Sequence, residues 1–161
     1  MRFTTLAATL ASASQATALL AGLSAPATIA PGSRFNLTLI ASPRAEPRPE
    51  VAVSYGWSAN NGFEGALGYN VQSMFLGPSL SDTDNNITIL AQAPAREDLI
   101  PGRPAGPGPD ENMFLNIAFF QLGPGNSYPA ISSYNVSVMI GEETSEGVLV
   151  GSTTPLLVMY A

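Results

Sequence analysis

An alternation of apolar and polar residues with a period of two constrains the fold of this chain more than any other feature. It is clearest in residues 35–39 (FNLTL), where three apolar residues alternate with Asn36 and Thr38. Side chains of a strand point alternately to opposite faces, so this spacing predicts a strand with one buried face and one face in water. Residues 86–89 (NITI) and 134–138 (YNVSV) repeat the pattern.

Prolines and glycines separate these segments. The chain of 161 residues contains 14 Pro and 15 Gly, which interrupt it too often for long helices. The segments between them predict seven or eight short strands: 19–23, 34–41, 51–57, 69–76, 86–92, 113–122, 131–140 and 148–150. The expected fold is all-β, an immunoglobulin-like sandwich of antiparallel strands without disulfides, because the chain has no Cys.

Residues 113–122 (MFLNIAFFQL) are apolar at positions of both parities. A strand of this kind is usually central and covered on both sides, and a partner-binding surface is the alternative interpretation. Residues 94–109 contain five prolines and three glycines, which predicts a long, mobile, irregular loop. The domain is expected to span 19–152. Residues 153–161 form either an extra edge strand or a loose C-terminal tail.

The N-terminal residues 1–18 resemble a signal peptide. Arg2 supplies a positive charge before an apolar run, and small residues follow it. Cleavage is expected after Ala13, Ala16 or Ala18, with Ala18 preferred. The apolar run is too short, and too interrupted by Thr and Ser, to span a bilayer. The sequence therefore predicts secretion into the extracellular space.

Three N-glycosylation acceptor motifs begin at Asn36, Asn86 and Asn135. In each, the alternation places Asn on the face opposite the apolar residues. Behind a signal peptide, this arrangement predicts glycosylation on the water-facing side of the strands.

Charge and residue content exclude several functions. Twelve acidic residues against six basic ones give a net charge of −6, which argues against nucleic acids and anionic membranes as partners. The chain has no His and no Cys. Nucleophilic systems that use His, ordinary zinc sites and His-ligated copper sites are therefore excluded. We assign no catalytic, cofactor-binding or metal-binding residues and expect a protein that is not an enzyme.

Carboxylates leave two further possibilities. The neighbouring pairs at 97–98, 110–111 and 142–143 could hydrolyse glycosides only if rigid elements brought two carboxyls together, and solvated loop charge is the preferred interpretation. Residues 82–85 (DTDN) resemble the start of a calcium loop. The positions that require Gly and Glu hold Ile87 and Ala93 instead, so we assign no calcium site.

Three aromatic residues, Trp57, Phe63 and Tyr69, surround a glycine-rich stretch. They could form a recognition patch. We prefer core positions for Trp57 and Tyr69 and an exposed position for Phe63, which follows the turn dipeptide Asn61-Gly62.

Several motifs in order resemble the necrosis-inducing secreted protein family of filamentous fungi. They are residues 24–32 (SAPATIAPG), 35–39 (FNLTL), 75–78 (FLGP), and 134–138 (YNVSV) followed by 141–145 (GEETS). The resemblance extends from about Leu23 to Gly151. It implies a small secreted β protein that acts as an effector, provokes plant cell death, and suppresses immunity by binding receptor-associated kinases.

The functional prediction is a non-enzymatic, monomeric effector that binds a host protein and could enter host cells. The candidate partner surface comprises Phe63, Glu64, Arg96 and Arg103, which lie in predicted loops. The alternative is a module that binds carbohydrate or the fungal cell wall, for which exposed coplanar aromatic residues on one sheet face are expected.

Overall fold

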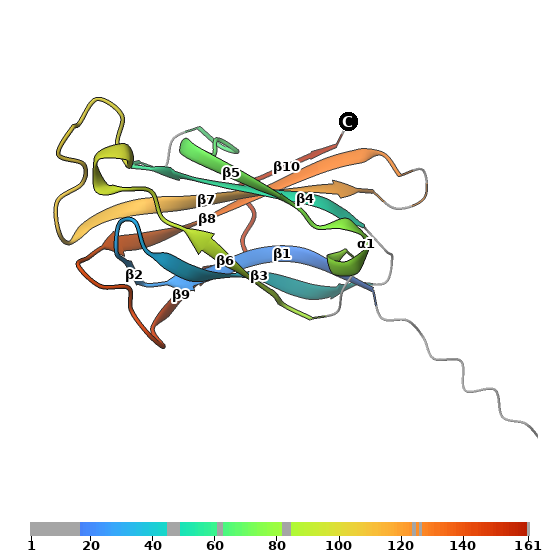
Figure 1. Ribbon diagram of the computed structural model, residues 1–161. Coiled ribbons are helices and arrows are strands. Elements are labelled where there is room, and N and C mark those ends of the chain that lie inside the picture. The colour runs from blue at the N-terminus through green and yellow to red at the C-terminus, as the bar shows by residue number, and fades with distance from the viewer. Residues whose placement is uncertain are drawn as a thin grey trace, which may run out of the picture.

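The computed structural model describes residues 17–44, 49–60, 63–81, 85–123, 125 and 127–160, and these form two facing β-sheets (Figure 1). Residues 1–16 of the expected signal peptide, the Asn61-Gly62 turn and residues 82–84 lie outside the described residues. No helix in the described part is long and apolar enough to cross a membrane.

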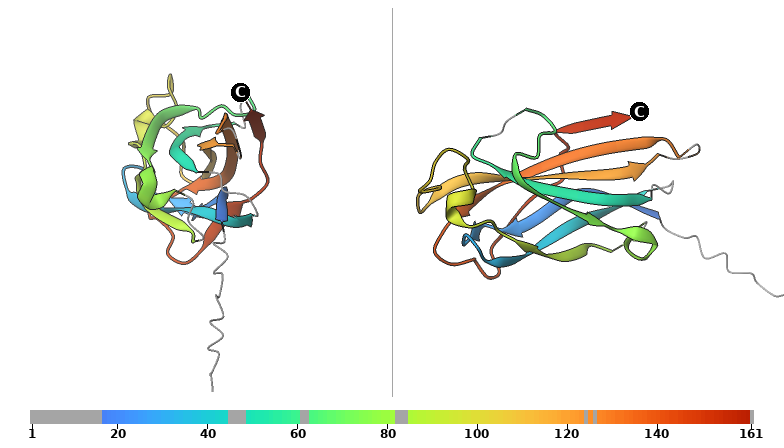
Figure 2. Two further views of the ribbon diagram at one scale, coloured as in Figure 1. Left: turned by 90° about the vertical axis from the view of Figure 1, so that its right-hand side faces the viewer. Right: turned by 45° about the horizontal axis from the view of Figure 1, so that its top comes forward.

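Sheet A is antiparallel and has the order β6 (Ile87–Gln92), β3 (Arg34–Arg44), β1 (Thr17–Pro26), β9 (Leu149–Ser152). Sheet B has the order β10 (Leu157–Tyr160), β8 (Pro129–Ile140), β7 (Glu111–Leu122), β4 (Glu50–Ser58), β5 (Tyr69–Phe75). The short β2 (Thr28–Ile29) pairs in parallel with β8, so sheet B is mixed. Viewed end-on, sheet B curls around the core like half a barrel (Figure 2).

The inward faces of the two sheets form the hydrophobic core. In β3 the apolar positions of the alternation, Phe35, Leu37 and Leu39, are all buried. In β7 the inward residues are Met113, Leu115, Ile117 and Phe119, each 0% exposed. Between the sheets, the ring of Trp57 lies edge-on to Phe35, with centroids 5.9 Å apart.

The all-β prediction is confirmed, and the described residues form ten strands where seven or eight were expected. The sequence did not predict β2, the one-turn helix α1 (Gly77–Leu80) or the 3-10 turn η1 (Arg96–Asp98). For the end of the chain, the structure shows the edge-strand alternative, because β10 pairs with β8. The immunoglobulin-like connectivity stays a prediction.

Two expectations about burial are corrected. Trp57 is fully buried as expected, but Tyr69 is 52% exposed, because it begins β5 at the edge of sheet B. Strand β7 is central, between β4 and β8, yet its outer face is not covered throughout. Phe120 remains 37% exposed there. The outer face of sheet B thus exposes a large apolar side chain to water.

Candidate functional site: the loop end of the sandwich

Three loops meet at one end of the sandwich, at the left of Figure 1, and we name residues 30–33, 93–110 and 141–148 the loop end. Hydrogen bonds join them: the N–H of Gly32 donates to the carbonyl of Pro94, and the N–H of Ala30 donates to Oγ1 of Thr144 at 3.1 Å. The strand register brings loops 93–110 and 141–148 together, because Glu111 at the start of β7 pairs with Ile140 at the end of β8.

The four predicted partner residues lie on two neighbouring loops. Arg96 and Arg103 belong to the loop end. Phe63 and Glu64 stand on the β4–β5 connection, where Phe63 is 88% exposed. This connection approaches β10, because a Cβ on Gly65 would lie 2.6 Å from the Leu157 side chain. The structure therefore confirms that Phe63 is exposed and divides the predicted surface into two parts.

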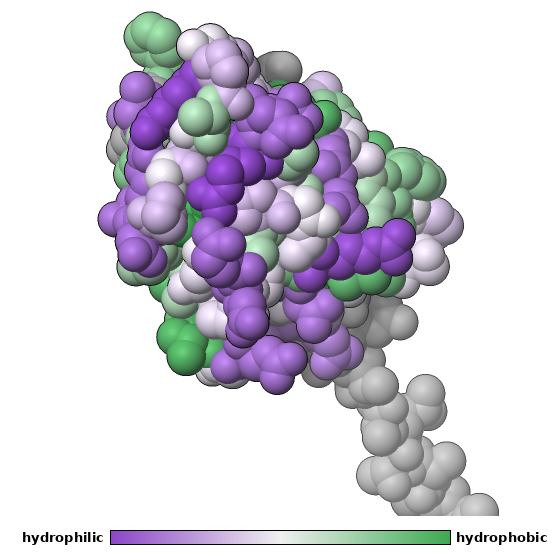
Figure 3. All heavy atoms as spheres, turned by 60° about the vertical axis from the view of Figure 1, so that its left-hand side comes forward, coloured by the Kyte–Doolittle hydropathy of each residue, from purple (hydrophilic) through white to green (hydrophobic). Residues whose placement is uncertain are grey.

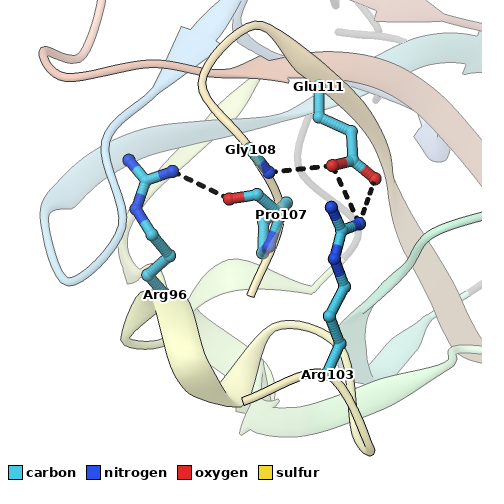
Figure 4. Close-up of polar contacts among 5 residues, drawn as sticks. All are labelled: Arg96, Arg103, Pro107, Gly108 and Glu111. Carbon is cyan, nitrogen blue, oxygen red and sulfur yellow. Dashed lines mark hydrogen bonds and ion pairs between the residues drawn. The ribbon is translucent and has the colours of Figure 1, made fainter. Parts of the chain in front are cut away.

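Both arginines of the predicted surface hold the loop end together (Figure 4). Nη1 of Arg103 donates to both carboxylate oxygens of Glu111, at 2.8 and 2.9 Å. Nη1 of Arg96 donates to the carbonyl of Pro107 at 2.8 Å, and its Nη2 lies 3.3 Å from Oε1 of Glu142. Both guanidinium groups therefore already form hydrogen bonds and ion pairs within the chain, which a partner would have to break or share.

The long loop 93–110 is irregular, as predicted, but it has internal contacts that a mobile segment would lack. Leu99 is only 1% exposed and joins the core cluster. Gly106 has a φ of +64°, and a Cβ there would collide with the backbone of Arg96. Glycine is required at this position both for the backbone conformation and for the close packing.

The carboxylate of Glu111 accepts hydrogen bonds from two parts of loop 93–110. The N–H of Gly108 donates to its Oε2 at 2.8 Å, and Arg103 donates from the other side. These hydrogen bonds hold the pKa of Glu111 below its ordinary value of 4.5, and the bond from the Gly108 N–H has the largest effect. The group is thus a stable anion that fixes the last turn before β7.

The loop end holds half of the acidic residues. Six of the twelve acids in the chain lie there, and Glu111 follows directly at the start of β7; the six are Glu97, Asp98, Asp110, Glu142, Glu143 and Glu146. Figure 3 shows a largely hydrophilic surface at this end. The sequence showed these acids as separate pairs, and the fold gathers them into one surface. The signal that could have revealed this is their position in loops at the same ends of strands.

The three glycosylation motifs differ in accessibility. Asn36 is exposed on the outer face of β3. Asn86 is exposed just before β6, and its Oδ1 accepts a hydrogen bond of 2.9 Å from the N–H of Ala41. Asn135, on β8, is half-buried. Its cross-strand neighbour on β7 is Asn116, which is 3% exposed.

The described residues contain no group of three or more acidic, His or Cys side chains that could hold a metal ion. A groove of about 530 Å³ opens between the sheets beside β10 and is lined mainly by apolar and hydroxyl side chains. None of the four predicted partner residues lines this groove.

Comparison with known proteins identifies the family. Residues 16–139 match the profile of the Nis1 family, which covers more than half of the chain. The chain belongs to the Nis1 family. Necrosis-inducing secreted protein 1 of Colletotrichum orbiculare is 31% identical over 143 residues, which are 88% of this chain and 82% of that protein. The protein of the same name from Colletotrichum higginsianum is 28% identical over 132 residues, 81% of this chain and 84% of that protein.

The predicted resemblance is therefore confirmed. The Nis1 relatives carry names that describe secreted, necrosis-inducing proteins and no enzymatic activity. The Nis1 match includes the whole of loop 93–110, so this loop belongs to the part of the chain that resembles the family.

Proposed function

We propose that this protein is a secreted effector that binds a host immune-signalling protein, suppressing defence or inducing cell death in plant tissue. Its membership of the Nis1 family, over residues 16–139, is the observation that supports this function. A receptor-associated kinase is the partner that the family resemblance suggests. The acidic loop end is the proposed contact surface, together with the exposed Phe63.

The charge of the loop end supports a basic partner surface. Six acids lie there beside only two arginines, and both arginines form ion pairs within the chain, with Glu142 and with Glu111. An excess of one sign steers an oppositely charged partner and raises its association rate, with strong dependence on salt. Phe63, on the β4–β5 connection, would add a separate apolar contact with the partner.

Expression in leaf tissue tests the function. The secreted protein should cause cell death or reduce the oxidative burst that an elicitor triggers. If the protein accumulates and neither response changes, the effector function is wrong. Co-purification from the same tissue identifies the partner and shows whether it is a kinase.

A pair of matched variants tests the surface. Glu97→Gln combined with Glu143→Gln removes two exposed negative charges from the loop end. Ser79→Lys combined with Thr154→Lys changes the net charge equally at exposed positions elsewhere. The first variant should slow association with the partner at low salt, and the second should not. Equal effects would show that net charge alone matters.

A module that binds carbohydrate is the second candidate, and one feature of sheet B favours it. Residues in register form an apolar row across its outer face: Phe75, Ala52, Phe120, Ile131 and Met159. Phe75 and Phe120 are 70% and 37% exposed. Retention on chitin or glucan, lost in Phe75→Ser, would support this function, and no retention would exclude it for these polymers.

A further inference from the structure

The outer face of sheet A carries a groove with Asn36 in its wall. The groove has a volume of about 510 Å³, within the range of sites for small ligands. Asn36 pairs with Leu90 on β6, and Pro26 pairs with Leu149 on β9. Leu90 and Leu149 are 64% and 60% exposed. Two large apolar side chains thus stand in water on either side of a glycosylation motif.

We propose that Asn36 carries an N-linked glycan whose first sugars lie in this groove and cover Leu90 and Leu149. This inference concerns modification of the protein and does not depend on its proposed function. It rests on the position of the motif, because both Asn36 and Thr38 point to the outer face of β3 and Asn36 lines the groove.

The chemistry is that of glycan transfer during secretion. The side-chain Nδ2 of Asn36 attacks C1 of the first sugar of a lipid-linked oligosaccharide diphosphate. The C1–N bond forms, the C1–O bond to the diphosphate breaks, and the lipid diphosphate leaves with the electron pair. The amide gives up one proton to the transferase or solvent. The hydroxyl of Thr38 completes the acceptor motif.

The groove suits the sugars that would be attached. N-acetylated sugars present C–H groups and a methyl group, which can pack on exposed leucine side chains and remove them from water. The charged groups of Arg34 and Glu146 line the same groove and can bind sugar hydroxyls. Arg34 is not part of either described ion pair. The groove therefore offers both apolar and charged side chains to an attached sugar.

The other two motifs do not have this setting. Asn135 is half-buried in the centre of sheet B, opposite the buried Asn116, where an attached sugar would meet the sheet surface at once. Asn86 is held against β3 by its hydrogen bond with Ala41, and it does not line the groove. The structure thus distinguishes three motifs that look alike in the sequence.

Intact-mass measurement of the full chain secreted from a eukaryotic host tests the modification. Asn36→Gln and Thr38→Ala should each lose one whole glycan, whereas Thr38→Ser should retain it. Asn135→Gln should lose none. A wild-type mass without a glycan at Asn36 would overturn the proposal, and loss of a glycan on replacing Asn135 would overturn the distinction between the motifs.

Binding of an apolar fluorescent dye tests the groove. Thr38→Ala, without the glycan, should bind more dye than the wild type, and adding Leu90→Ser and Leu149→Ser should remove this increase. Phe75→Ser, on the outer face of sheet B, should lower dye binding equally with and without the glycan. If the glycosylated and unglycosylated proteins bind dye equally, the sugars do not cover the leucines.

Discussion

Glu50 and Gln121 connect the two sheets at a point where β1 is paired with β3 on one side but has no strand on the other among the described residues. They are cross-strand neighbours in sheet B, 2% and 3% exposed. The N–H of Leu20 in β1 donates to Oε1 of Glu50 at 2.8 Å, and Nε2 of Gln121 donates to the carbonyl of Leu20 at 3.3 Å. Strand β9 pairs with β1 only from Leu23 onward, so these side chains replace a missing ladder partner.

Replacing Glu50 tests this role. Glu50→Ala leaves the N–H of Leu20 unpaired in the interior, which should lower the free energy of unfolding by about 1–3 kcal/mol. Glu50→Gln keeps an acceptor oxygen and should cost less. Urea unfolding measures both values. If the Ala variant is as stable as the wild type, the hydrogen bond to Leu20 contributes nothing to stability.

The alternation of apolar and polar residues correctly predicted which apolar side chains are buried. It did not predict which polar side chains are buried. Phe35, Leu37 and Leu39 lie inward as their spacing required. The burial of Glu50 could not be predicted, because acidic residues are rarely buried without a specific partner, and the partner here is the backbone of a strand 30 residues earlier. Tyr69 was placed wrongly because aromatic residues at sheet edges often remain partly exposed.

At the scale of elements, loop 93–110 differs most from its prediction. Its proline and glycine content correctly excluded a long helix or strand. Composition could not show that Leu99 anchors it in the core, nor that its own arginines bind Pro107 and Glu111. Such contacts depend on how the loop folds back on itself, which local sequence patterns do not encode. Strand β2 was missed because two residues carry no periodicity.

The hydrogen bonds of Glu111 make this loop sensitive to acid. The folded-state pKa lies below 4.5, so the stabilisation is complete above about pH 4.5 and is lost as the pH falls through the folded-state value. The amide proton shift of Gly108, followed by NMR, should titrate with a midpoint below 4.5.

Two variants separate the causes. Arg103→Gln should move this midpoint upward but leave it below 4.5, because the larger contribution comes from the Gly108 N–H. Arg34→Gln, on β3, removes the same charge away from this contact and should leave the midpoint unchanged. A midpoint at or above 4.5 in the wild-type protein would contradict the hydrogen bonds described here.

At the scale of the whole molecule, the two outer faces differ. The outer face of sheet A carries the groove with Asn36, and that of sheet B carries the apolar row through Phe75 and Phe120. The two-sheet architecture could be predicted from strand number and spacing. The groove, the row and the acidic loop end could not, because each joins residues of strands or loops that are distant in sequence.

We expect the protein to be a monomer. The edge strands of the two sheets are short: β9 and β10 have four residues each, β6 has six and β5 has seven, which offers little backbone for pairing with a second copy. Light scattering during gel filtration should give the mass of one chain with its glycan at micromolar concentration. A dimer that Phe120→Ser dissociates would show instead that the apolar row of sheet B is a self-association surface.

Trp57 is the only tryptophan of the chain, and it lies fully buried between the sheets against the edge of Phe35. Its indole is therefore an intrinsic optical probe of the distance between the two sheets. Emission should be blue-shifted in the native protein and move to longer wavelength when the sheets separate. Because Phe35 belongs to β3 of sheet A and Trp57 to β4 of sheet B, the same emission reports unfolding of either sheet without a label.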